Sequence, residues 1–120
     1  MSIDQIDRRL LSKAKKIAIE RRFINIILRG SMFSVFIYIG SKCDYVLDLN
    51  NCSCPAFLFN VVLRKKQEHC YHILGLKYAL EKDKIIKIEL ALKDLSEILS
   101  DIYTCGKSLK LRKIVSNLES

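Results

Sequence analysis

The 120-residue sequence is poor in the residues that characterise disordered and collagen-like proteins. One proline and four glycines are too few for a disordered or collagen-like chain. The hydrophobic share of 50% and the charged share of 28% are instead those of an ordinary folded protein. Because a chain of this length can bury one core, we expect a single domain over residues 1–120.

Export and membrane signals are also lacking. The N-terminus has no basic start followed by an apolar stretch, so we expect an intracellular, cytoplasmic protein, or a nuclear one in a eukaryote. The longest apolar region, Phe23 to Gly40, contains Asn25, Arg29 and Ser34, which would be costly in lipid. We interpret it as two strands joined by a turn and expect no membrane partner.

Acidic residues are few, since 13 Asp and Glu stand against 21 Lys and Arg, for a formal net charge of +8. The excess lies in two segments. Residues 1–30 hold eight basic and three acidic side chains, and residues 61–90 hold seven and four. Such a balance favours a negatively charged partner, nucleic acid first.

Apolar residues recur at spacings of three and four near the N-terminus, which predicts an amphipathic helix over residues 3–22. Arg8, Lys15 and Arg22 are spaced by seven, so they lie near one another on its outer side. This stripe is either a solvated face or a surface that contacts phosphates.

Three strands are predicted next, from segments rich in β-branched and aromatic residues. They cover Phe23 to Arg29, Met32 to Ile39 and Asp44 to Leu49, with glycine-containing turns between the first two and after the second. The expected fold is α+β: a small three-stranded antiparallel meander flanked by N-terminal and C-terminal helices.

The C-terminal helices are expected at about residues 85–118, with Gly106 between them. The first has a broad apolar face whose members are spaced by three and four. They are Ile85, Ile88, Leu92, Leu95, Leu99 and Ile102. This face either packs on the sheet or contacts a protein partner.

Cysteine and histidine are the most informative residues, because three of five cysteines and both histidines lie within 21 positions. Cys52 and Cys54 stand at a predicted turn after the third strand, and Cys70 and His72 open a predicted helix. Three thiolates and one imidazole form a complete tetrahedral ligand set for one structural zinc ion. The zinc site is thus expected between the strand end and the helix.

Two questions stay open among the cysteines and histidines. His69 can replace His72 as a ligand if both His69 and Cys70 turn inward, but His72 fits better. Cys43 and Cys105 are interpreted as small buried hydrophobes, although a redox or ligand role is also compatible with a thiol.

Catalytic signatures are missing. A site with four protein ligands has no open position for water. The sequence has no Gly-rich phosphate loop, no His-Glu-x-x-His helix and no Cys-His pair with an orienting partner outside the cluster. We therefore expect a protein that is not an enzyme.

The segment from Tyr45 to Phe57 (YVLDLNNCSCPAF), followed by His69 to Leu80 (HCYHILGLKYAL), resembles a SWIM-type zinc finger, whose pattern is Cys-x-Cys, a variable segment, then Cys-x-His. The resemblance covers about residues 45–80 and implies zinc ligation by the same four residues. Two departures are Tyr71, where the family commonly has lysine, and the absence of glycine before Cys70.

The resemblance also implies a function. Small SWIM proteins, archaeal ones among them, are adaptors that pair with RecA/Rad51-type recombinase paralogues in homologous recombination and DNA repair. Our first hypothesis is such an adaptor, using the apolar face between residues 85 and 102; oligomeric state stays open. The alternative is direct DNA or RNA binding through a basic surface made of Arg8, Lys15, Arg22, Arg64, Lys65, Lys66 and Lys77.

Overall fold

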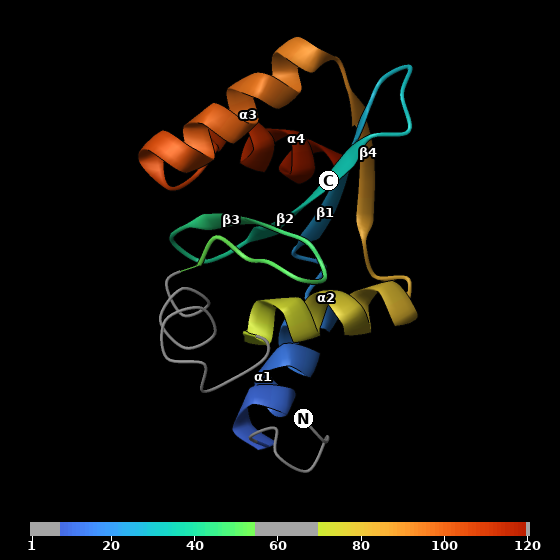
Figure 1. The fold of residues 1–120 in the computed structure, drawn as a ribbon, viewed down its shortest axis with the longest axis vertical. Helices are drawn as coiled ribbons and strands as arrows, with labels where there is room; N and C mark the ends of the chain where they lie inside the picture. The colour runs from blue at the N-terminus through green and yellow to red at the C-terminus, as the bar shows by residue number, and fades with distance from the viewer. Residues whose placement is uncertain (1–7, 55–69, 120) are drawn as a thin grey trace.

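The computed structural model describes residues 8–54 and 70–119, which form an α+β fold around one sheet (Figure 1). Its four described strands follow the order β3-β2-β1-β4. In chain order the described elements are α1 (Arg8–Ile19), β1 (Phe23–Leu28), β2 (Ser34–Ile39), β3 (Asp44–Leu47), α2 (Tyr71–Glu81), β4 (Ile86–Leu90), α3 (Leu92–Cys105) and α4 (Leu109–Glu119). None of these helices combines the length and apolar character that a bilayer crossing requires.

The antiparallel part of the sheet is the predicted meander of β1, β2 and β3. Ile24 in β1 lies opposite Ile37 in β2, and Tyr38 in β2 lies opposite Tyr45 in β3. Gly30 follows β1 with a φ of +77°, a conformation that glycine adopts at little steric cost. The meander is confirmed, but it is part of a larger sheet.

The fourth strand, β4, corrects the sequence prediction. It runs parallel to β1, with Ile88 opposite Ile26, in a segment for which the sequence pattern predicts a helix. Ile86, Ile88 and Leu90 alternate with two charged residues, which is the period of a strand. The same apolar positions also fit helical spacing when the window is extended to Leu92, which explains the wrong prediction.

The apolar face predicted between residues 85 and 102 is therefore divided between β4 and α3. Of its six residues only Leu92 is largely exposed, at 64%. The others are buried (Ile88, Leu95 and Ile102) or packed at the edge of a core (Ile85 and Leu99). They do not form one exposed partner surface, and packing on the sheet accounts for most of them.

The N-terminal helix ends earlier than predicted. Within the described residues α1 begins at Arg8 and ends at Ile19, and residues 3–7 lie outside the described part. Arg21 has a φ of +56°, which is incompatible with a continued α-helix. Arg22 therefore belongs to the connection into β1 rather than to the helix.

Helices cover both faces of the sheet (Figure 1). On one face Phe23 and Tyr38 form a core with α1 and α2. On the other face Ile24 and Ile37 form a second core with α3 and α4. This alternation follows from the strand period, since successive residues such as Phe23 and Ile24 point to opposite faces.

The contact between α1 and α2 is close because of Gly75. A Cβ atom at this position would lie 2.8 Å from Ile17 Cδ1 and 3.1 Å from Phe23 Cζ. Glycine therefore lets α1 and β1 pack directly on the backbone of α2. The position of α1 thus depends on the position of α2.

A buried ion pair ties α4 to the turn between β2 and β3. The Asp44 side chain is fully buried and accepts a 2.7 Å hydrogen bond from Arg112 Nη2 and a 2.9 Å bond from the Ser108 N–H. Arg112 also donates to the Gly40 carbonyl, at 3.1 Å. The hydrogen bonds to Asp44 raise the pKa of Arg112, which stays charged throughout the accessible pH range.

We predict that Asp44→Ala lowers the free energy of unfolding by about 2–4 kcal/mol, because it leaves the Arg112 guanidinium and the Ser108 N–H without their buried acceptor. Urea denaturation measures this. Glu89→Ala is the control, since the Arg29–Glu89 pair is exposed and should change stability by less than about 1 kcal/mol. Equal effects of the two substitutions would contradict the structural role of Asp44.

Candidate metal centre

A tight turn places Cys52 and Cys54 beside β3. Asp48 Oδ1 accepts hydrogen bonds from the N–H groups of Asn50 and Asn51, both at 2.7 Å, which reverses the chain after β3. The returning segment then pairs with β3: the Ser53 N–H donates to the Val46 carbonyl, and the Ser53 hydroxyl accepts from the Val46 N–H. Residues on either side of Ser53 therefore point to the same side, so both thiols face α2.

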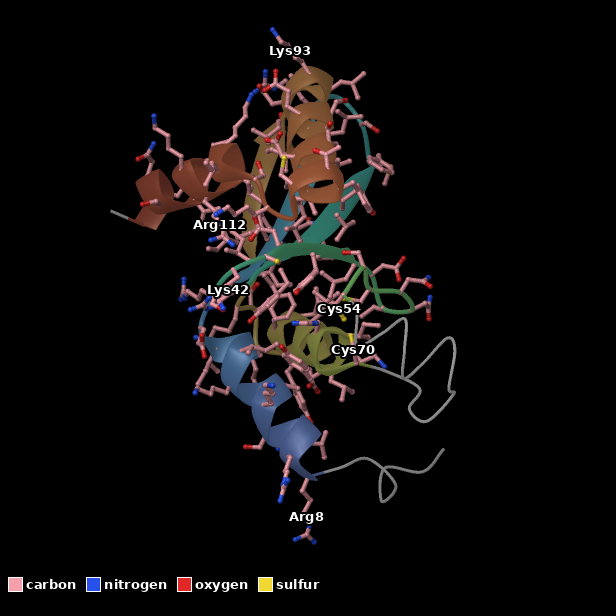
Figure 2. The ribbon with its side chains drawn as sticks, turned by 90° about the vertical axis from the view of Figure 1, so that its left-hand side faces the viewer. Arg8, Lys42, Cys54, Cys70, Lys93 and Arg112 are labelled. Atoms are coloured by element: carbon pink, nitrogen blue, oxygen red, sulfur yellow. The ribbon has the colours of Figure 1, made fainter. Side chains whose placement is uncertain are left out.

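The other two candidate ligands stand at the start of α2. Cys70 is the N-cap residue, in an extended conformation, and His72 is the second residue of the helix. At this end of a helix the amide N–H groups and the positive dipole stabilise a thiolate. Figure 2 shows Cys54 and Cys70 beside each other, close to the end of α2.

The structure brings all four predicted ligands together. One donor atom from each of Cys52, Cys54, Cys70 and His72 lies within 4.8 Å of the other three, and each residue is buried. Cys52 Sγ and His72 Nδ1 are 3.9 Å apart. Ligands of one tetrahedral zinc ion are separated by about 3.5–3.8 Å, so small side-chain adjustments suffice for this set to hold one metal ion.

The pKa shifts of the clustered thiols are also compatible with a bound cation. The pKa of the Cys52 thiol is raised by its hydrogen bonds with Cys54 and Cys70 and by burial. The hydrogen bond with Cys52 lowers the pKa of Cys70, but the bond with Cys54 and burial outweigh it and bring the value to about 11. Buried thiols this close resist ionisation, and a divalent cation supplies the charge that lets them act as thiolate ligands.

Three tyrosine rings surround His72, an arrangement that sequence reasoning missed. The ring centroids of Tyr38, Tyr45 and Tyr71 lie 4.7, 5.0 and 4.0 Å from that of His72. The alternation of β2 and β3 could have placed Tyr38 and Tyr45 on one face, but their pairing with each other depends on strand register. Burial raises the pKa of all three hydroxyls, which are therefore neutral.

Four of the predicted basic residues are described, and they lie on α1, on α2 or in the connection from α1 to β1. Arg8 and Lys15 on α1 and Lys77 on α2 are exposed. Arg22 instead pairs with Glu20 at 2.8 Å and donates to the Ile39 carbonyl. The remaining candidates lie outside the described residues: Arg64, Lys65 and Lys66.

Two described cysteines do not belong to the cluster: Cys43 and Cys105. His69 lies outside the described residues, so its replacement of His72 as a ligand stays a hypothesis. Cys43 is half-buried, but Cys105 is exposed, so the expectation that both are buried is wrong for Cys105. Cys105 stands at the last position of α3, on the solvent side of the helix.

The fold and the site thus define an α+β protein with a buried three-cysteine, one-histidine cluster between β3 and α2. A scan against protein-family models, a search of curated proteins and a search of solved structures each found no match.

We predict that Cys54→Ser abolishes metal binding and lowers the free energy of unfolding by about 3 kcal/mol or more, because metal binding at such a site contributes directly to folding. Elemental analysis of the purified protein and thermal denaturation measure the two effects. Cys105→Ser is the matched control, because this exposed thiol lies outside the cluster. Retention of the metal by Cys54→Ser would show that the ligand assignment is wrong.

Proposed function

We propose that this protein is a SWIM-type zinc adaptor that binds a RecA/Rad51-like paralogue and supports homologous recombination. The observation that carries the proposal is the buried cluster of three thiols and one imidazole, in the order and spacing Cys-x-Cys, Cys-x-His. Soft thiolate ligands and an imidazole in a tetrahedral set favour zinc among the common divalent ions.

The metal has a structural role in this proposal. Four protein ligands complete the coordination of zinc and leave no position for a substrate or an activated water. All four are buried, with His72 only 3% exposed. The protein therefore acts by binding partners rather than by catalysis.

The partner surface that the exposed residues support best is a groove between the β2–β3 side of the sheet and α3, with a volume of about 500 Å³. Phe33 and Tyr103 line it and are 54% and 66% exposed, and the adjoining Met32 is fully exposed. Exposed aromatic residues around a groove are typical of protein interfaces. This groove replaces the apolar face expected between residues 85 and 102.

We predict that Phe33→Ala weakens the complex with a co-expressed RecA/Rad51-like paralogue about tenfold or more, as expected for loss of an aromatic anchor. Co-purification and isothermal titration calorimetry give the Kd. Leu109→Ala is the control, because Leu109 is 68% exposed but lies on α4, outside the groove. Absence of a complex would contradict the adaptor function, and equal effects of both substitutions would exclude the groove as its site.

Direct nucleic-acid binding is a second function, favoured by the composition of α1. This helix carries five basic residues and no acidic one, and the five are exposed: Arg8, Arg9, Lys13, Lys15 and Lys16. Such a helix can neutralise backbone phosphates with little sequence preference.

We predict that the double variant Arg8→Gln/Lys15→Gln reduces the dependence of log K on log salt for duplex DNA by about 1.8, since each lost phosphate contact removes about 0.9. Fluorescence anisotropy over a salt series measures this slope. Lys93→Gln is the control, because Lys93 is exposed at the opposite end of the molecule from Arg8 (Figure 2). An unchanged slope in the double variant would contradict a role of α1.

A further inference from the structure

Beside the metal centre lies a pocket with aromatic walls, of about 300 Å³. Tyr38, Tyr45 and Tyr71 line it together with His72. Tyr38 and Tyr45 are direct cross-strand partners, so their rings stand next to each other on one face of the sheet. Tyr71 joins them from the first position of α2. The volume of this pocket is at the lower end of the range for small-ligand sites, which is enough for one planar ring system.

The rim of this pocket is the turn from Gly40 to Cys43. The Gly40 N–H donates to the Cys43 carbonyl at 2.9 Å, and a Cβ atom at Gly40 would lie 2.5 Å from that oxygen. The turn is therefore held in one tight conformation that requires glycine. It presents Lys42, which is exposed and lines the pocket.

Three further cations lie around the residues that line the pocket, but carboxylates neutralise two of them. Lys13 Nζ is 4.4 Å from the centroid of the Tyr71 ring. Arg22 and Arg112 donate to the carbonyls of Ile39 and Gly40, which lead into the turn. Two nearby carboxylates are already paired, Glu20 with Arg22 and Asp44 with Arg112. The positive charge at the pocket therefore comes from Lys42 at the rim and Lys13 over the Tyr71 ring.

The arrangement discriminates between ligand classes. Aromatic walls alone would also suit a quaternary ammonium group, but the ammonium group of Lys42 at the rim, and that of Lys13 over the Tyr71 ring, repel a cation. The rim, which contains Lys42, favours an anion, whereas the aromatic interior of the pocket does not. A neutral aromatic ring inside, joined to an anionic group outside, satisfies both parts, and a nucleotide within a strand has this structure.

We propose that the pocket binds one unstacked base of a single-stranded nucleic acid, with the adjoining phosphate held by Lys42. In a duplex the bases are stacked inside the helix and cannot enter, so the site selects single strands. This inference deepens the second function proposed above and rests on it, while the adaptor function is independent of it.

The test compares three ligands of equal length with the metal-loaded protein: oligothymidylate, the same backbone with abasic positions, and duplex DNA. Fluorescence anisotropy gives each Kd. We expect oligothymidylate to bind about tenfold or more tightly than the abasic strand, because base stacking on aromatic side chains has this magnitude. Oligouridylate shows whether the site also accepts RNA.

Variants then locate the effect. Tyr45→Leu should weaken oligothymidylate binding about tenfold and leave duplex and abasic binding within about twofold, whereas Tyr45→Phe keeps the ring and should resemble the unaltered protein. Leu92→Ala is the control, because Leu92 is an exposed apolar residue that lies outside both this pocket and the groove. Lys42→Gln should lower the salt dependence for single strands by about 0.7.

The outcomes that would contradict the base pocket differ from those that would contradict the second function. Equal Kd values for oligothymidylate and the abasic strand overturn the base pocket, even if Tyr45→Leu does not fold. The base pocket is also overturned if Tyr45→Leu, with its metal bound, loses affinity for duplex DNA and for the abasic strand. Such a loss would mean that the Tyr45 ring supports binding of the phosphate backbone rather than binding of a base. Absence of binding to every polyanion at low salt rejects the second function together with the pocket, while complex formation with the recombinase paralogue reports on the adaptor function separately.

Discussion

The arrangement of the α1 and α2 side depends on the charge balance of three buried thiols and one imidazole. Cys52 and Cys54 come from a turn beside β3, whereas Cys70 and His72 come from the start of α2, so the cluster joins two parts of the chain that are distant in sequence. Burial and mutual contact resist ionisation of the thiols, and a divalent ion held by the cluster would remove that cost. The position of α2 then sets that of α1, which packs against it at Gly75.

The opposite face of the sheet is anchored by a different chemistry. There the Asp44 carboxylate receives hydrogen bonds from Arg112 and Ser108, which fixes α4 against the turn between β2 and β3. A buried carboxylate is costly without its hydrogen-bond partners, so α4 must dock where Arg112 and Ser108 reach Asp44. The pair therefore determines the position of α4 more than it adds to the net stability of the fold. The same turn forms the rim of the aromatic pocket, which His72 of the cysteine and histidine cluster also lines.

Local sequence patterns predicted the candidate ligands and the meander. The features that depend on pairing between distant segments could not be predicted from them. The spacing of Cys52, Cys54, Cys70 and His72 identified a cluster that the structure brings within 4.8 Å. By contrast, β4 pairs with β1 across about sixty residues of sequence, and its apolar positions also fit a helix. The contact of Tyr38 and Tyr45 with His72 required both the strand register and the position of α2.

The metal centre borders both proposed binding surfaces. Cys52 lines the groove that contains Phe33, and His72 lines the aromatic pocket on the other side of the cluster. One ion would therefore order a protein-binding and a nucleic-acid-binding surface together, although it contacts neither ligand. The groove and the pocket are lined by different residues, and a hollow lined by both Tyr103 of the groove and Tyr45 of the pocket lies between them. In the proposed adaptor, the protein partner and the single strand would therefore lie on neighbouring surfaces that border the same cysteine and histidine cluster.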